Sequence, residues 1–461
     1  MTRGPAERLV RRVWSDLARD PAELDALDPL PTAPLPARLD VSGLAVGAVA
    51  AASLAAGSSR GLGRRVSRIH LDGDRIAVAF TSERWFLQDG VRPEVWAPLS
   101  GFWRAADGWV RTHGNYPHHA AALRRTLGLR TGADAASVGE AILAWHAQEL
   151  ESAVTAAGGL CVAVRPENPA ADADLTERPL IDVRRLGEAS ARPWRKQTPD
   201  AGSRAPLAGV RVLDLTRVIA GPVATRTLAL LGADVLRIDP PEPAELSPQH
   251  LDTGAGKRSA ILDVRRAEDA SRFNMLLGTA DVVVLGYRPA SLERHALDPE
   301  SLVARQPGLV IAQLAAWGFD GDQAERAGFD SLVQAASGIA SVEGSHDRPG
   351  VLPAQALDHS TGYLLAASVV SLLDRQRSDG GSWLARMSLR RTAAELLTMP
   401  RTAEPSPDGS LDEVRVHDHL ETLEGDVAVR VPRPAVALAS PLDHWPAAPN
   451  PWGADAARWA V

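Results

Sequence analysis

The stretch from Pro206 to Asp239 constrains the fold most, because one short segment contains a strand, a helix and a second strand. Val210–Leu215 is an apolar run rich in β-branched residues, which is typical of a buried strand. A turn at Ala220-Gly221-Pro222 leads into an apolar helical stretch that Gly232 is placed to end. Ala233–Ile238 predicts the second strand, and such units cross over right-handed between parallel strands. The sequence therefore predicts an α/β fold with an open, mostly parallel, Rossmann-like sheet.

The turn of this unit argues against a dinucleotide cofactor. It is Ile219-Ala220-Gly221-Pro222 and not the G-x-G-x-x-G of dinucleotide-binding folds. A proline at the start of the helix also lacks the amide that a pyrophosphate would bind. We therefore place a nicotinamide oxidoreductase last among the functions considered.

Composition excludes several classes of protein. The net charge of −7 argues against a nucleic-acid partner. The single cysteine, Cys161, cannot form an intrachain disulfide, and its apolar neighbours predict a buried strand. The first residues contain no signal-like apolar region, and the apolar stretch Gly43–Gly57 is too short to span a bilayer. We expect a cytoplasmic protein that binds neither nucleic acid nor membrane.

Three histidines, His113, His118 and His119, raise the possibility of a metal site. No acid or cysteine stands beside them at ligand spacing, and adjacent histidines point to different faces of a helix. The sequence therefore predicts solvated or capping histidines and no metal.

The N-terminal half is expected to be mostly helical. The patterns predict helices at Ala6–Leu17, Val41–Ala56, Pro117–Leu127 and Ser137–Ala157, and a β-hairpin whose strands, Val66–Leu71 and Ile76–Phe80, flank Asp72-Gly73. The polar segment Gly187–Arg204 is expected to be an exposed linker.

Several motifs of the second half resemble those of one family. They are LAGVRVLDLTRVIAGPVATRTLALLGADVLRID, GKRSAILD from Gly256 and GFDSLVQAASG from Gly328. Together they resemble the class III coenzyme A transferases of the CaiB/BaiF type. The resemblance is strong over about 207–399, and 100–190 more loosely resembles the small domain of that family, here placed before the large one. The expected division is an N-terminal region at 1–190, a linker at 191–206, a CoA-binding large domain at 207–399, and a hairpin with a Pro/Trp-rich tail at 400–461.

Asp358 is the candidate catalytic residue. It precedes a long apolar helix, and position alone favours a role as the helix N-cap. The nucleophilic aspartate of the family stands four residues before a glycine at the start of such a helix, and Asp358 and Gly362 fit this spacing. Nearby, Asp330 is expected to be a structural helix cap and Gln334 buried scaffold.

The resemblance also implies residues that bind coenzyme A (CoA). Lys257 and Arg258 would meet its phosphates, and Tyr287 would offer a flat face for adenine. The full set of implied CoA-binding residues is Ile219, Gly221, Arg237, Lys257, Arg258, Tyr287, Arg288 and Arg294. CoA would be a substrate, with no tightly bound cofactor.

The resemblance implies a transferase that moves CoA between an acyl-CoA thioester and a carboxylic acid. An aspartyl anhydride and an aspartyl-CoA thioester would be intermediates, and the protein would be an interlocked homodimer. The main alternative is an inactive CoA-binding scaffold or regulatory pseudoenzyme, because the domain order is unusual and no glycine-rich loop can be identified. A 2-methylacyl-CoA racemase is less favoured, since Phe329 stands where that subgroup has its histidine.

Overall fold

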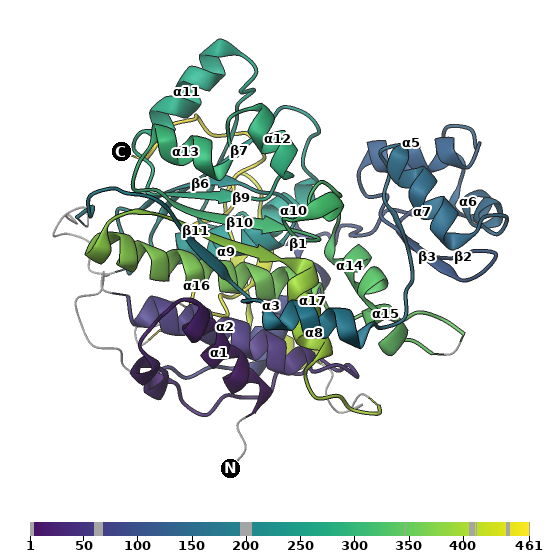
Figure 1. Cartoon of the computed structure of the whole chain (residues 1–461), viewed down its shortest axis with the longest axis horizontal. Helices are drawn as coiled ribbons and strands as arrows, with labels where there is room; N and C mark the ends of the chain where they lie inside the picture. The colour runs from purple at the N-terminus through teal and green to yellow at the C-terminus, as the bar shows by residue number, and fades with distance from the viewer. Residues whose placement is uncertain are drawn as a thin grey trace.

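A seven-stranded sheet forms the centre of the folded molecule (Figure 1). The computed structural model describes residues 4–59, 68–193, 205–345, 347–404, 411, 413–438 and 443–460. The strand order is β5-β11-β10-β9-β6-β7-β8. All neighbours are parallel except β5 and β11, which are antiparallel. The predicted α/β fold with an open, mostly parallel sheet is confirmed. The strands of this sheet are β5 (Asp182–Gly187), β6 (Arg211–Leu215), β7 (Asp234–Asp239), β8 (Arg258–Ile261), β9 (Val282–Leu285), β10 (Val310–Ala315) and β11 (Ser382–Ser388).

Helices cover both faces of this sheet. Successive strand residues point to opposite faces, and on these strands the residues of both faces are apolar. Val212 and Val284 face a core that includes α9 (Ala220–Leu230) and α16 (Ala356–Asp379). Leu213 and Val283 face a second core. The second core includes α11 (Ala267–Leu277), α12 (Pro289–Arg294) and α13 (Pro299–Arg305). The N-terminal helices α1 (Pro5–Asp16) and α2 (Val41–Gly57) pack beneath α16 (Figure 1).

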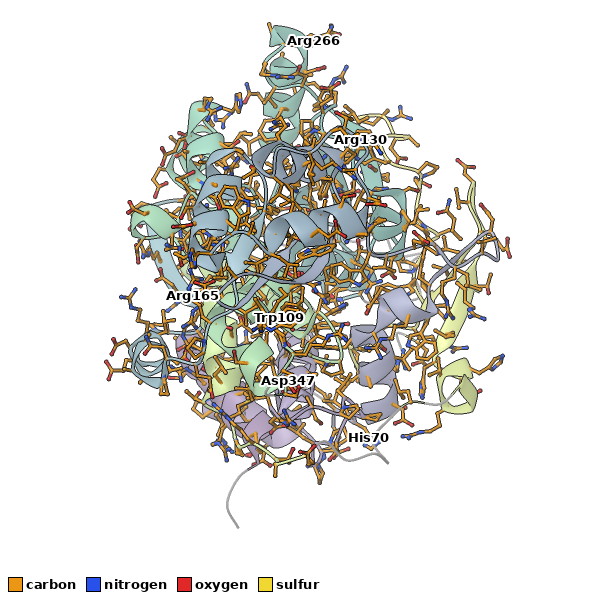
Figure 2. All side chains as sticks on the ribbon, turned by 90° about the vertical axis from the view of Figure 1, so that its right-hand side faces the viewer. His70, Trp109, Arg130, Arg165, Arg266 and Asp347 are labelled. Carbon is orange, nitrogen blue, oxygen red and sulfur yellow. The ribbon has the colours of Figure 1, made fainter. Side chains whose placement is uncertain are left out.

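A small lobe stands beside the large sheet, at the right of Figure 1. Its three strands pair in the order β2-β3-β4, and it has its own apolar core. The predicted buried position of Cys161 is confirmed, since this residue begins β4 and is 2% exposed. Figure 2 views the molecule from this side, with Trp109, Arg130 and Arg165 labelled. The elements of the lobe are β2 (Gly101–Arg104), β3 (Trp109–Thr112), α5 (Pro117–Thr126), α6 (Ala135–Ile142), α7 (Ala147–Ala156) and β4 (Cys161–Ala163).

The C-terminal tail docks on the large sheet through tryptophans. Trp452 donates to Asp239 Oδ2, at the end of β7, at 3.0 Å, and Trp459 donates to Thr279 Oγ1 at 2.9 Å. These contacts pack the Pro/Trp-rich tail against the rest of the chain. The remaining elements are η1 (Pro21–Ala26), α3 (Gly73–Phe80), α4 (Ser82–Trp85), β1 (Leu87–Gln88), α8 (Pro169–Glu177), α10 (Ser247–Asp252), η3 (Gly321–Gln323), α14 (Asp330–Ser337), α15 (Ile339–Val342), α17 (Leu389–Leu397), α18 (Glu413–His417), β12 (Leu420–Leu423) and β13 (Val429–Pro432). None of the helices in the described residues is long and apolar enough to cross a membrane.

The hairpin expected around Asp72-Gly73 is wrong. Gly73–Phe80 is the helix α3, and the Asp72 carboxylate caps it by accepting the amides of Asp74 and Arg75. The second expected strand is buried among helices, where alternation of side chains carries no signal. Residues 66 and 67 of the first expected strand lie outside the described residues, as do 194–204 of the expected linker.

Two other expectations for the N-terminal half are also wrong. The single helix expected at Ser137–Ala157 is divided into α6 and α7, because Asp107 accepts the amide of Ala147 and starts a new helix there. The strand β5 falls within the segment assigned to the small-domain-like part, yet it pairs with β11 of the large sheet.

Candidate active site

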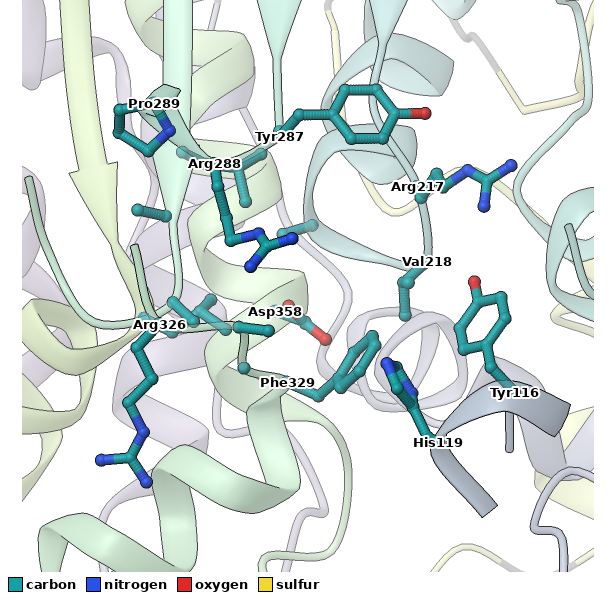
Figure 3. A pocket seen from close by; sticks show the side chains of 18 of the residues that line it. Tyr116, His119, Arg217, Val218, Tyr287, Arg288, Pro289, Arg326, Phe329 and Asp358 are labelled. Carbon is teal, nitrogen blue, oxygen red and sulfur yellow. The ribbon is translucent and has the colours of Figure 1, made fainter. Parts of the chain in front are cut away.

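A cavity of about 270 Å³ opens between the large sheet and the small lobe (Figure 3). It lies at the carboxyl ends of β6, β9 and β10, the edge at which open α/β sheets bind ligands. Helix α5 of the small lobe closes it from the other side. Its lining consists of Tyr116, His118, His119, Arg217, Val218, Ala220, Pro243, Gly286, Tyr287, Arg288, Pro289, Leu314, Ala315, Ala316, Ala324, Arg326, Ala327, Gly328, Phe329, Asp358 and Leu389.

The carboxylate of Asp358 faces this cavity (Figure 3). Asp358 is 6% exposed and occupies the third position of α16, which begins at Ala356 with Gln355 as its N-cap. The N-cap role expected from position is therefore wrong. The residue still lies in the first turn, where the helix dipole favours a negative charge.

Asp330 and Gln334 hold the start of α16 in place. Asp330 accepts the backbone amide of Asp358 at 2.9 Å and the side-chain amide of Gln334 at 2.5 Å. Gln334 in turn accepts the amide of Leu352 at 3.0 Å. Asp330 is thus a helix cap, as expected, but it caps α16 and not α14, the helix that it begins. Gln334 is buried scaffold, as predicted.

Asp330 and Asp358 differ in the pKa of their carboxyl groups. Burial raises the pKa of Asp330 to about 6, against the amide hydrogen bonds that lower it. Burial also raises the pKa of Asp358 well above its ordinary value, and the negative charge of Asp330 raises it further. Asp330 therefore ionises first, and Asp358 keeps its proton to higher pH.

The rings of Phe329 and His119 form part of the cavity wall. Phe329 stacks on His113 with 4.0 Å between ring centroids, and His119 meets Phe329 edge-on at 6.2 Å. Burial lowers the pKa of His113 to about 3 and that of His119 to about 4, so both rings are neutral near pH 7. Among the described residues, no group of three or more histidines, cysteines and acids could hold a metal ion.

Val218 is a strained residue at the edge of the cavity. Its φ of 71° lies in the left-handed region, which a β-branched side chain rarely adopts. The strained residue joins the end of β6 to the start of α9, and Ala220, which begins α9, lines the same cavity. Such strain persists where the surrounding structure enforces it, often at functional sites.

Four of the predicted CoA-binding residues lie at or beside this cavity. Tyr287 and Arg288 line it, and Ile219 is the N-cap of α9 between two lining residues. Gly221 is buried within α9, where a Cβ atom would lie 2.3 Å from Cβ of Thr216. Gly221 therefore permits the close turn between β6 and α9 but does not line the cavity.

Three other predicted CoA-binding residues lie in ion pairs away from the cavity. Arg237 Nη2 contacts Glu245 Oε2 at 2.7 Å, and Lys257 Nζ contacts Asp214 Oδ2 at 3.2 Å. Arg258 Nη2 contacts Asp234 Oδ1 at 2.5 Å. Lys257 and Arg258 lie at the amino end of β8, opposite to the ligand edge of the sheet. The assignment of Arg237, Lys257 and Arg258 to CoA is corrected, because each compensates an acid of the fold.

Arg294 is exposed in the last turn of α12 and does not line the cavity.

The sequence analysis missed several cationic and aromatic residues of the cavity. Arg217 follows the carboxyl end of β6 and pairs with Asp239 at 3.1 Å. Its position directly after a predicted strand was a usable signal. Tyr116 and Arg326 are distant in sequence from the β6–β7 unit, so only the fold brings them to the cavity.

A second hollow of about 220 Å³ continues along the same edge of the sheet. It lies at the carboxyl ends of β6 and β7 and includes Arg265 and His295. Tyr287 lines both hollows.

The fold and the site together define an α/β protein with a buried carboxylate at the ligand edge of a parallel sheet. Residues 207–432 match the model of the family described as CoA-transferase family III, and this part of the chain belongs to that family. The resemblance stated from the sequence motifs is confirmed.

Relatives of this chain are named as CoA-transferases. A probable fatty acyl-CoA transferase of Mycobacterium tuberculosis is 33% identical over 195 residues, which are 39% of this chain and 50% of the relative. A succinate–glutarate CoA-transferase of Agrobacterium fabrum is 34% identical over 196 residues, 38% of this chain and 49% of the relative. A crystal structure of a hypothetical protein from M. tuberculosis is 33% identical and has a TM-score of 0.39, covering 42% of this chain and 57% of that one. The chain thus spans about half the length of the curated relatives that it matches.

Proposed function

We propose that the protein is a cytoplasmic CoA-transferase with Asp358 as its nucleophile. The observation that carries this proposal is the carboxylate of Asp358 in the cavity at the carboxyl ends of the parallel strands, within the region that matches the family. The names of the relatives support the same reaction class. The substrates would be an acyl-CoA and a carboxylic acid.

In the proposed reaction the Asp358 carboxylate attacks the thioester carbonyl carbon. The carbon–sulfur bond breaks, and a mixed anhydride and the CoA thiolate form. The thiolate then attacks the aspartyl carbonyl, the anhydride C–O bond breaks, and the donor acid leaves. An acceptor carboxylate attacks the resulting aspartyl-CoA thioester and again displaces the thiolate. The thiolate attacks the new acyl carbonyl, which yields the product acyl-CoA and restores the Asp358 carboxylate.

The attack requires Asp358 to be ionised, whereas burial and Asp330 raise its pKa. We expect the rate of the first half-reaction to rise with pH through the raised pKa of Asp358. Arg288 lines the cavity and is exposed, so it is available to bind the negatively charged parts of the substrates.

The two hollows suggest how CoA would lie. The thioester would reach Asp358 in the first hollow, and the nucleotide end would occupy the second, beside Arg265 and His295. Tyr287 lines both hollows, and its ring would pack against CoA between its two ends. Arg294 remains a candidate for a phosphate contact. Its side chain is exposed on α12, and Leu292 of the same helix lines the second hollow.

Trapping of the acyl-enzyme tests the proposal. The protein is incubated with an acyl-CoA and hydroxylamine, and modified peptides are identified by mass spectrometry. We expect a hydroxamate on Asp358, its absence in Asp358→Asn, and its persistence in Asp379→Asn, an exposed carboxylate at the other end of α16. A hydroxamate elsewhere would remove Asp358 from its role.

Two other outcomes would favour the alternatives. Binding of CoA without any adduct across a panel of acyl-CoA esters would indicate the pseudoenzyme. Incorporation of solvent deuterium at the α-carbon of a 2-methylacyl-CoA would indicate the racemase. We do not expect it, because Phe329 cannot take a proton and burial makes His119 a weak base, with a pKa of about 4.

A homodimer is also proposed, and it rests on the resemblance to the family. The candidate cavity is already formed by two lobes of one chain. Light scattering of the purified protein measures the oligomeric state directly, and a mass of one chain would overturn the dimer without affecting the proposed chemistry.

A further inference from the structure

A buried cluster of polar side chains lies beside the turn that joins β6 to α9. Lys257 is 5% exposed, and Asp214 and Thr225 have no exposed surface. The Lys257 ammonium group contacts Asp214 Oδ2 at 3.2 Å and Thr225 Oγ1 at 3.0 Å. It also donates to the carbonyl oxygen of Pro222 at 3.4 Å. Three acceptors match the three donors of an ammonium group, so Lys257 is fully engaged within the fold.

The Asp214 carboxylate connects the two sides of this turn. Its Oδ1 accepts the backbone amide of Thr216 at 3.1 Å and the hydroxyl of the same residue at 2.5 Å. Its Oδ2 accepts the hydroxyl of Thr225, in the second turn of α9, at 2.6 Å. A buried carboxylate is costly without a compensating charge, and Lys257 supplies that charge. The cluster therefore fixes the start of the turn relative to α9.

The turn itself is strained and forms part of the wall of the candidate active site. Val218 has a φ of 71°, in the left-handed region. Val218 and Ala220 line the same cavity as Asp358 (Figure 3). Strain of this kind persists only where the surrounding structure enforces it. Because the Asp214 carboxylate holds residues on both sides of Val218, the cluster supplies this constraint.

The start of α9 also contacts the helix that carries Asp358. A Cβ atom at Gly362 would lie 2.6 Å from the carbonyl oxygen of Ala220, so the backbones of the two helices are in close contact. Gly362 lies one helical turn after Asp358. A shift of the β6–α9 turn would therefore move the cavity wall relative to the Asp358 carboxylate.

We propose that Lys257 and Asp214 are positioning residues for the acyl transfer at Asp358. They hold the β6–α9 turn in the conformation that places a bound thioester against the carboxylate, and they touch neither the substrate nor the reacting atoms. This inference rests on the proposed function. It gives the lysine of the GKRSAILD motif a role in the reaction other than the binding of CoA phosphates.

The charge of Lys257 makes this arrangement sensitive to pH. Burial lowers the pKa of Lys257 to about 8, Asp214 opposes this shift, and the charges of Arg237 on β7 and Arg226 on α9 add to it. His250 of α10 is neutral at pH 7 and above, because burial lowers its pKa to about 4. Loss of the Lys257 proton weakens the compensation of the Asp214 charge. We therefore expect the rate constant of acylation to fall as the pH rises through about 8.

Two variants of Thr225 separate positioning from packing. The full chain is mixed with acetyl-, butanoyl- or succinyl-CoA, hydroxylamine is added at set times, and the hydroxamate on Asp358 is quantified by mass spectrometry. Thr225→Val keeps the shape of the side chain but removes the hydroxyl that binds Asp214 and Lys257, and it should lower the rate constant about tenfold or more. Thr225→Ser keeps the hydroxyl and should stay within about threefold of the parent chain. The reverse order would indicate packing alone and overturn the proposal.

Binding of CoA distinguishes a misplaced turn from a general loss of structure. The Kd of CoA, measured by isothermal titration calorimetry, should change by less than about twofold in Thr225→Val, since the substitution does not touch the ligand. A Kd that weakens in parallel with the rate constant would overturn the proposal. Thr155→Val, on the exposed face of α7, is the matched control and should leave both quantities within about twofold.

Lys257→Met tests the role of the charge. The variant should lower the rate constant about tenfold or more and remove its fall above pH 8. A parent chain whose rate constant does not fall above pH 8, or an identical fall in Lys257→Met, would overturn the proposal. If none of the three acyl-CoA esters gives a hydroxamate on Asp358 in the parent chain, the proposed function fails, and this inference fails with it. A hydroxamate that forms as fast in Thr225→Val and Lys257→Met as in the parent chain overturns this inference alone.

Discussion

Asp358 and Asp330 are neighbouring carboxylates in unequal surroundings. Asp330 accepts a backbone amide and the side chain of Gln334, which support its negative charge. Asp358 faces the cavity, and both its burial and the charge of Asp330 favour its protonated form. An ionised Asp358 is therefore a cost to the folded state, as is common for residues whose position serves catalysis.

Asp358→Asn should raise the stability of the fold at high pH. The folded pKa of Asp358 lies above its value of 3.8 in the unfolded chain, so ionisation destabilises the folded state increasingly as the pH rises through this interval. The variant removes that penalty. We expect a gain of about 1–3 kcal/mol in the free energy of unfolding at pH 8, shrinking toward pH 5. Urea denaturation across this range measures it, with Asp379→Asn as control, and a pH-independent difference would contradict the argument.

Helices α9 and α16 approach each other closely at Gly362. A Cβ atom at this position would lie 2.6 Å from the Ala220 carbonyl oxygen and 2.8 Å from Cβ of Val223. Gly362 lies one helical turn after Asp358, so the contact fixes where the catalytic turn stands relative to the start of α9. This contact gives a physical reason for a glycine four residues after the aspartate.

Gly362→Ala separates two opposing effects. Helix propensity alone would make alanine more stable by up to about 1 kcal/mol. The close contact with the backbone of α9 should outweigh this, and we expect a net loss of about 1–3 kcal/mol together with lower transferase activity. Thermal and urea denaturation give the sign. A variant as stable as the parent chain would show that the helices adjust without cost.

A buried ionic cluster connects the small lobe to the large sheet. Arg237 lies between Asp239 and Glu245, with 2.7 Å to each carboxylate, and is 1% exposed. Glu245 also accepts the hydroxyl of Tyr116, the residue before α5, at 2.5 Å. The cluster therefore holds the helix that closes the candidate active site against the end of β7.

Removal of Arg237 should destabilise the fold, whereas removal of Arg294 should leave its stability almost unchanged. Arg237→Met leaves Asp239 and Glu245 with less compensation in a buried site, and we expect a loss of about 3–5 kcal/mol in the free energy of unfolding. Arg294→Met removes an exposed side chain and should change stability by less than about 0.5 kcal/mol. If Arg294 contacts CoA, its variant should instead raise the KM for acyl-CoA. Equal stability of both variants would show that the cluster does not join the lobes.

The sequence predicted those features that depend on neighbours along the chain. The β6–α9–β7 unit, the buried helix α2 and the buried strand at Cys161 follow from local patterns of apolar residues. The hairpin expected at Val66–Phe80 failed because the Asp72 side chain caps a helix there, a contact that competes with the turn signal of the same residues.

The cationic residues show why the candidate site was only partly predictable. A sequence motif records that Lys257 and Arg258 are basic, but not whether each faces a ligand or an acid of its own fold. Their place at the amino end of β8, and the partners Asp214 and Asp234, come from strand pairing over long sequence separations.

Local chemistry along the chain thus determines the type of sheet, the family resemblance and the position of Asp358 in the first turn of α16. Only the tertiary structure decides that Asp330 caps that turn, that α5 closes the cavity, and which arginines are already paired. The physical reason is that strand and helix signals arise from neighbouring residues. Burial, charge compensation and pKa depend on groups that long-range packing alone brings together.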